Sequence, residues 1–224
     1  MRNVSFRLLK KDKIFWFLLL FTYIILPFFD VKRIGVVDTF GELIFRMLTH
    51  QIFVAFLILF AVKRAINEKI FVLQKTLLVI YTNDLRKTMI DTMKCTMISH
   101  LCFYNIGQVL FQLSCFLFTN KIYNIPLLFI LYINVEIITI ILSIFCLFLI
   151  FQKDIIVYFV YYISIIILLV INHFYITIPY TIKMVDSLIG FRWDIFLIRI
   201  LIMIVSILVF VKSVRKYTEI FFQQ

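Results

Sequence analysis

The sequence predicts an all-α integral membrane protein with six membrane-spanning helices. Three observations lead to this fold class. Hydrophobic residues make up 64% of the 224 residues and the mean hydropathy is +1.08, whereas water-soluble domains are about 45–50% apolar. The apolar residues fall into long runs, and the Lys and Arg residues gather in alternate segments between those runs. Residues 1–224 are expected to form one domain, because no linker rich in Gly, Pro or Ser interrupts them.

Each predicted span is an apolar run bounded by polar segments. The first run follows a basic stretch at residues 2–13, and no small-residue cleavage site follows it, so we expect an uncleaved anchor. With 16 residues it is only about 24 Å long, so the bilayer has to thin or the flanking residues have to snorkel. The predicted spans are Ile14–Phe29, Leu43–Val62, Met97–Phe118, Ile125–Phe151, Ile155–Ile178 and Ile195–Val211.

The distribution of basic residues predicts that both termini lie in the cytoplasm. In this topology the internal segments hold 16 of the 23 Lys and Arg residues, and the external half holds 7. The inverse topology would break the positive-inside bias at the first span and at the long segment between spans two and three. We therefore interpret the net charge of +11 as basic residues in the loops that set the topology and contact anionic lipid headgroups. Nucleic-acid binding is not expected.

The connector Lys63–Thr96 is the long polar segment around which the other spans are arranged. It carries seven basic and three acidic residues. Apolar residues at helical spacing over 69–82 predict a helix on the cytoplasmic surface, and a second helix is expected to run from Leu85 into the third span. Two readings stay open: the connector docks a cytoplasmic partner, or it lies on the membrane without one.

Polar residues inside the spans are the other candidates for function, because each needs a partner in lipid. Asn105, Gln108 and Gln112 follow one another at steps of three and four, so they share one face of the third span. This face lines a polar path, or it bonds to neighbouring helices. Glu136 lies deep in the fourth span, and Arg199 in the sixth is its candidate partner by depth. The pair would form a gating or proton-sensitive site, or a structural bond.

Several chemistries are not indicated. The four glycines are isolated, so there is no nucleotide-binding P-loop. The four cysteines form no CxxC motif, and neither a metal site nor a disulfide framework is expected. His100 and Cys102 are near each other in sequence. At a spacing of two residues on a helix their side chains point to different sides, so they do not form a catalytic dyad.

The order of these elements resembles that of ABC-2 type transporter permeases, and most of all small permeases of Gram-positive peptide-antibiotic export or immunity systems. The matching segments are Arg2–Lys13, LLVIYTNDLRKTMIDTMK at Leu77–Lys94 and IPYTIKMVDSLIGFRWD at Ile178–Asp194. In that family these segments are an interfacial helix, a coupling helix and a re-entrant element. No residue motif is diagnostic. The short external loops and the short first span depart from the family.

The resemblance implies a permease subunit in the bacterial cytoplasmic membrane that exports, or gives immunity to, a peptide or other amphipathic substrate. It further implies a separate ATPase that binds ATP, a second permease chain, and no cofactor or metal of the chain's own. The residues that would contact the ATPase are Lys75, Arg86, Lys87 and Asp91. Two alternatives are a stand-alone immunity or scaffold protein without transport activity, and an intramembrane cysteine peptidase, against which the His100 and Cys102 spacing argues.

Overall fold

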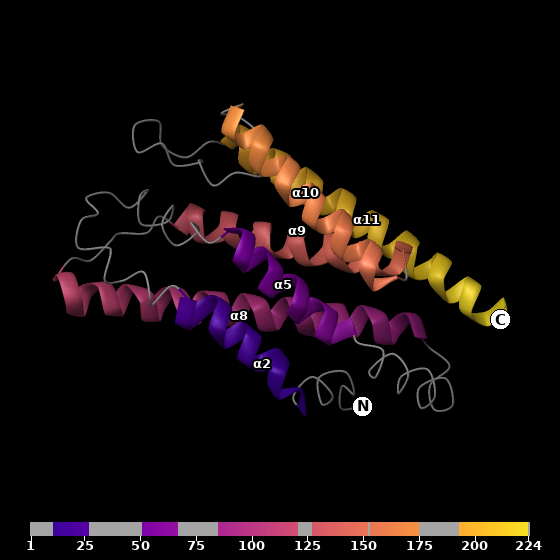
Figure 1. The fold of residues 1–224 in the computed structure, drawn as a ribbon, viewed down its shortest axis with the longest axis horizontal. Helices are drawn as coiled ribbons and strands as arrows, with labels where there is room; N and C mark the ends of the chain where they lie inside the picture. Colours follow the sequence, from indigo (N-terminus) through magenta and orange to yellow (C-terminus); the bar gives the residue numbers. More distant parts are fainter. Residues whose placement is uncertain are drawn as a thin grey trace.

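The computed structural model describes residues 11–26, 51–66, 85–120, 127–151, 153–174 and 193–223, and all the regular structure in these ranges is helical (Figure 1). The N-terminal helix changes from α to π geometry, so it is described as α2 followed by η1. The elements are α2 (Lys13–Leu20), η1 (Phe21–Ile25), α5 (Gln51–Ile66), α8 (Leu85–Thr119), α9 (Leu127–Phe151), α10 (Asp154–Phe174) and α11 (Trp193–Gln223).

Each predicted span overlaps one of these helices, but the helices at two places are longer than the apolar runs. As expected, α8 begins at Leu85 and enters the third apolar run without a break. The helix α11 continues through residues 212–223, which the sequence indicated only as a short basic tail. Residues 27–29 and 43–50 of the first two predicted spans, residues 1–10 and most of the connector lie outside the described ranges.

Two helix ends have clear local causes. Asp12 caps α2, because its Oδ1 accepts hydrogen bonds from the backbone N–H groups of Ile14 and Phe15, both at 3.1 Å. Asn120 closes α8 with a left-handed φ of 53° and donates its backbone N–H to the carbonyl of Phe116 at 2.9 Å. Asn is one of the few side chains that adopt this conformation readily at a helix C-terminus.

The core lies where α9 packs against its neighbours α5, α8, α10 and α11. Leu59 and Val62 of α5, Ile141 and Ile144 of α9 and Val157 of α10 are fully buried. Several buried Ser and Thr hydroxyl groups each donate a hydrogen bond to the carbonyl four residues earlier in their own helix. Examples are Thr22, Thr96, Ser114 and Thr139, with oxygen–oxygen distances of 2.7–2.8 Å.

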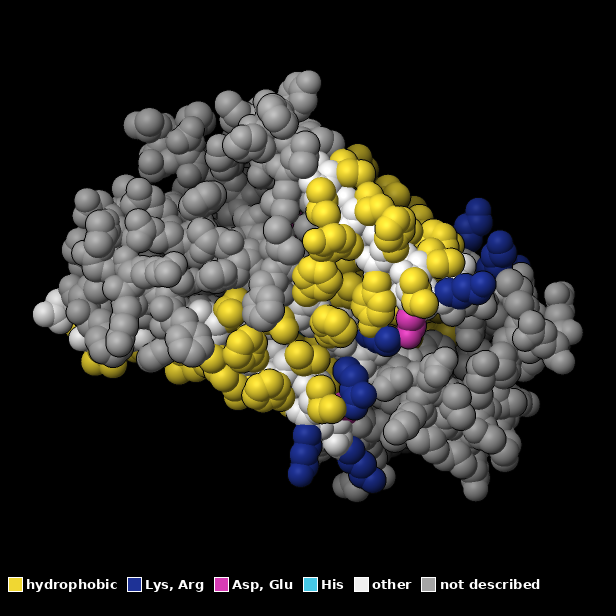
Figure 2. Space-filling view, viewed as in Figure 1, with side chains coloured by type: hydrophobic (Ala, Val, Ile, Leu, Met, Phe, Trp, Pro, Cys, Tyr) yellow, Lys and Arg dark blue, Asp and Glu magenta, His cyan; other side chains and the backbone are white. Residues whose placement is uncertain are grey.

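The exterior of the helices is strongly apolar. Figure 2 shows hydrophobic side chains over much of the described surface, with Lys and Arg at its edge. Within the described residues, Ile133–Phe151 and Phe196–Lys216 are each long and apolar enough to cross a membrane, and Lys13–Ile25 and Asp154–Ser164 are shorter apolar helices. Exposed apolar surface of this extent is unusual for a soluble monomer, and it indicates a membrane protein.

Candidate functional site

Contacts between the helices show that the described basic residues gather at one end of the bundle. Ion pairs join the C-terminal end of α5 to the N-terminal ends of α2 and α10. Ring contacts of Phe15 with His100, and of Tyr23 with Tyr104, make α8 parallel to α2. Phe145 contacts Phe210 and Cys146 contacts Ser206, and Figure 1 shows that α9 and α11 run in the same direction. The start of α8 and the end of α11 therefore lie at this same end (Figure 1).

We call this end the basic end. Within the described ranges, Arg199 is the one Lys or Arg position toward the opposite end. The basic residues assigned to the basic end by their positions are Lys11, Lys13, Lys63, Arg64, Arg86, Lys87, Lys94, Lys153, Lys212, Arg215 and Lys216.

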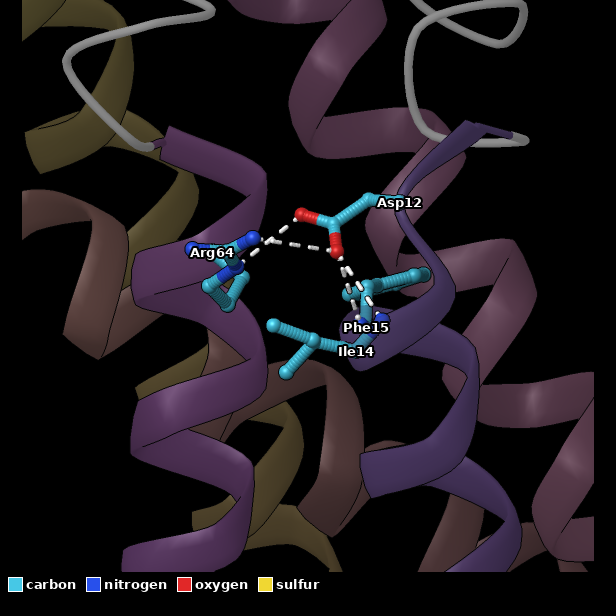
Figure 3. A network of polar contacts seen from close by, with 4 residues as sticks. All are labelled: Asp12, Ile14, Phe15 and Arg64. Atoms are coloured by element: carbon cyan, nitrogen blue, oxygen red, sulfur yellow. Dashed lines mark hydrogen bonds and ion pairs between the residues drawn. The ribbon is translucent and has the colours of Figure 1, made fainter.

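The first ion pair at the basic end joins Arg64 to Asp12, the capping residue of α2 (Figure 3). The guanidinium donates from Nε to Oδ2 at 3.0 Å and from its terminal nitrogen to Oδ1 at 3.3 Å. The Asp12 side chain is only 13% exposed. Because the same carboxylate also accepts two backbone N–H groups, its position is fixed from both sides.

The second ion pair joins Lys63 to Asp154, with Nζ and Oδ2 2.7 Å apart. Lys63 lies in the last turn of α5 and Asp154 in the first turn of α10, where each charge is favoured by the helix dipole. The Lys63 Nζ also lies 4.8 Å from the centre of the Tyr158 ring. Partial burial works against the charged form of Lys63, but the contacts with Asp154 and Tyr158 outweigh it and raise the lysine pKa.

A buried polar contact fixes α2 and η1 against α8. The Tyr23 hydroxyl and the His100 Nδ1 are 2.9 Å apart, and both side chains are buried. Beside them a Cβ on Gly107 would lie 2.1 Å from the Tyr23 carbonyl oxygen, so only glycine allows this approach of the two backbones. The π geometry of η1 occurs at the same place, and π turns in helices are frequent at functional sites.

The structure brings part of the predicted polar stripe into contact with α9. Asn105 and Asn134 exchange amide hydrogen bonds, with nitrogen–oxygen distances of 3.1 and 3.5 Å. Gln108 lies one turn after Tyr104 on the same helix. The Gln112 Nε2 is buried and has no hydrogen-bond partner among the described residues. Asn105 therefore makes the interhelix bond that the sequence offered as one of two readings.

Glu136 and Arg199 lie on the parallel helices α9 and α11. Glu136 is half-buried. On α9, Glu136 lies about nine residues before Phe145 and Cys146. On α11, Arg199 lies a similar number of residues before their contacts, Phe210 and Ser206. At 1.5 Å per residue this register places the two positions at the same depth. The side chain of Arg199 is outside the described part of the structure.

The predicted ATPase-contacting residues are described only in part. Lys75 lies outside the described ranges, and Arg86 lies on α8 with a side chain that is not described. Lys87 is exposed and Asp91 is half-buried, both on the first turns of α8 at the basic end. The structure thus places the last three of these positions on one helix segment.

The described residues offer no other obvious catalytic or metal-binding group. They contain no cluster of three His, Cys, Asp or Glu residues that could hold a metal ion. His100 is buried against Tyr23, whereas Cys102 is exposed. The geometry therefore agrees with the expectation that these two residues do not form a dyad.

Sequence reasoning missed the residues that hold the bundle together. Asp12 had a detectable signal, since an Asp just before an apolar run is a typical helix cap. Gly107 also had one, because a single glycine within an apolar helix commonly marks a close helix contact. The pairing of Tyr23 with His100, and of Lys63 with Asp154, joins residues far apart in the chain and has no local signal.

Comparisons of this chain with protein-family models, with curated proteins and with solved structures found no match.

Proposed function

We propose that this chain is the membrane-spanning permease subunit of an ABC transporter, with six spans and both termini in the cytoplasm. The substrate is a peptide or another amphipathic molecule, and a separate ATPase supplies the energy. The proposal rests on the order of elements given above and on the apolar, all-helical bundle with a basic end.

The basic end is the observation that supports a cytoplasmic orientation. Eleven of the twelve described Lys and Arg positions belong to it, and basic segments beside membrane spans stay in the cytoplasm. Labelling from outside the cell tests this orientation. A cysteine placed at Lys216 should react only after the membrane is permeabilised, and reaction in intact cells would contradict it.

The start of α8 is the proposed contact with the ATPase. The helix has 35 residues, about 52 Å at 1.5 Å per residue, whereas a hydrocarbon core is about 30 Å thick. One end of α8 therefore projects beyond the membrane, and the charged positions Arg86, Lys87 and Asp91 mark that end. A projecting helix that is continuous with a span transmits a displacement directly into the membrane.

Affinity purification from the native membrane tests the contact. We expect a P-loop ATPase to copurify with the chain, and to be lost when Arg86 and Lys87 are both changed to Glu. The matched control changes Lys212 and Lys216 to Glu, which removes two charges from the same end but from α11. Equal recovery of the ATPase in both variants would exclude α8 as the contact. A chain that purifies without any ATPase would favour the stand-alone membrane protein.

A further inference from the structure

The two ion pairs of the basic end connect different parts of the bundle. We define the N-terminal group as α2, η1, α5 and α8, and the C-terminal group as α9, α10 and α11. Arg64 and Asp12 lie within the N-terminal group. Lys63 and Asp154 connect the two groups. Adjacent residues of α5 thus make one contact inside a group and one across the boundary.

Each group is held together by contacts of its own. In the N-terminal group, Asp12 bonds to Arg64 and Tyr23 bonds to His100, so α2 is fixed to both α5 and α8. In the C-terminal group, the rings of Phe145 and Phe210 pack edge to face at 6.2 Å. Only Gln152 and Lys153 separate α9 from α10. Because α9 also packs against α5 and α8 in the core and Asn134 bonds to Asn105 of α8, movement at the basic end involves α10 relative to α5.

The boundary between α5 and α10 is formed by side chains in register. Phe56 lies against Tyr162 with ring centres 5.2 Å apart, and Phe60 lies against Tyr158 at 5.8 Å. The ion pair of Lys63 and Asp154 follows at the basic end. The two aromatic pairs are held by ring packing and not by a hydrogen bond between the rings, so they can separate without breaking a polar contact. The ion pair is therefore the polar contact that holds this boundary together.

The two ion pairs differ in how firmly they are held. Arg64 binds Asp12 through two nitrogens, and the side chains are 37% and 13% exposed. Lys63 binds Asp154 through one nitrogen, and the side chains are 31% and 50% exposed. The two cations are similarly exposed, but the Asp154 carboxylate is much more exposed than that of Asp12, and water and salt screen a single contact to an exposed carboxylate more than a bidentate contact to a mostly buried one. The contact across the boundary is therefore the weaker of the two.

We propose that Lys63 and Asp154 form a salt-sensitive latch, which closes the boundary between α5 and α10 at the basic end and releases when α10 moves away from α5. Lys63 stands at the end of α5, where the connector to α8 begins. A protein that binds the connector is therefore placed to open the latch. This last step rests on the proposed function, whereas the latch itself does not.

Disulfide cross-linking across the boundary tests the latch in the full chain. The four native cysteines are replaced by alanine, and Phe56→Cys and Tyr162→Cys are introduced two turns away from the ion pair. Lys63→Gln and Asp154→Asn should each lower the initial cross-linking rate roughly two- to fivefold, the range expected for one exposed ion pair. The exchange Lys63→Asp with Asp154→Lys should restore part of it, because the pair is remade but each charge now lies at the unfavourable end of its helix dipole, and 1 M salt should lower it only while a pair is present.

Two controls separate the latch from general effects. Lys153→Gln removes an exposed lysine next to Asp154, and it should leave the cross-linking rate unchanged. A second cysteine pair at Trp16 and Phe103, whose rings lie 5.7 Å apart within the N-terminal group, should cross-link equally in every variant.

An unchanged Phe56–Tyr162 cross-link in both single variants would overturn the latch. Loss of the Trp16–Phe103 cross-link together with it would also overturn it, because the ion pair would then support the whole fold. Either result is independent of whether an ATPase copurifies, so the latch and the proposed function fail separately.

Discussion

The contact of α2 with α8 and the contact of α9 with α11 both join parallel helices, but by different means. In the first contact, Tyr23 of η1, which continues α2, bonds to His100 of α8, and its backbone carbonyl lies directly against Gly107. Between α9 and α11, the Phe145 and Phe210 rings pack edge to face, and the Cys146 thiol lies 3.7 Å from the Ser206 carbonyl. The first contact is polar and close, and the second is mainly apolar.

Within the second contact, the two helices differ in burial. Half of the apolar stretch of α9 is buried, against 12% of that of α11. Lipid is as apolar as the side chains, so apolar contact alone gives helices little drive to associate in a membrane. A polar pair and a glycine thus fix the N-terminal helix against α8. The helix α11 is instead held against α9 mainly by apolar packing, and most of its surface is exposed. The predictions below test this difference.

Adding one methyl group at the α2–α8 contact should have the largest effect. In Gly107→Ala the new Cβ would lie 2.1 Å from the Tyr23 carbonyl oxygen. A backbone carbonyl cannot rotate away as a side chain does, so we expect a loss of more than about 3 kcal/mol, above the usual range for overpacking. Reversible denaturation in detergent, followed by circular dichroism, measures this loss.

The neighbouring Ile106→Ala is the matched control for Gly107→Ala. Ile106 is 53% exposed on the same helix, so its truncation should change the unfolding free energy by less than about 0.5 kcal/mol. Equal stability of Gly107→Ala and the parent chain would mean that α2 does not approach α8 this closely.

Removal of the buried hydrogen bond of Tyr23 should have the next largest effect on the unfolding free energy. Tyr23→Phe leaves the His100 Nδ1 buried without its partner, which should lower the unfolding free energy by about 1–3 kcal/mol. The double variant Tyr23→Phe with His100→Leu removes both polar groups, so it should regain part of the loss. A double-mutant cycle measures the coupling between the two residues.

Tyr162→Phe is the control for this cycle, because Tyr162 is 40% exposed and the loss of its hydroxyl should have little effect. Strictly additive losses in the Tyr23 and His100 cycle would show that the two residues do not interact.

The sequence predicted the helical class and the approximate place of each described helix, because both depend on local patterns. Each apolar run became a helix, since helices satisfy their own backbone groups without water. Asn105 was singled out because a polar side chain in an apolar run needs a partner, and it bonds to Asn134. The run at residues 212–223 was not recognised as helical, because its charges hide the continuation of α11.

The contacts that fix the bundle could not be predicted from the sequence, because they depend on which helices are neighbours. Lys63 and Arg64 are adjacent in the chain, yet they bind residues of two different helices. His100 was considered only beside Cys102, whereas its partner Tyr23 lies 77 residues away. One sequence indicates which residues need partners, but helix packing decides which partner each receives.

A substitution on the exposed side of α11 should have the smallest effect on the unfolding free energy. Leu208 is 64% exposed, whereas Phe210 on the same helix is 2% exposed and meets Phe145. Because lipid replaces the contacts of an exposed leucine, Leu208→Ala should change the unfolding free energy by less than about 0.5 kcal/mol. Phe210→Ala leaves a gap against α9 and should be the more destabilising of the two. If Leu208→Ala were as damaging as Phe210→Ala, protein and not lipid would cover this side of α11, and the second permease chain would be its expected occupant.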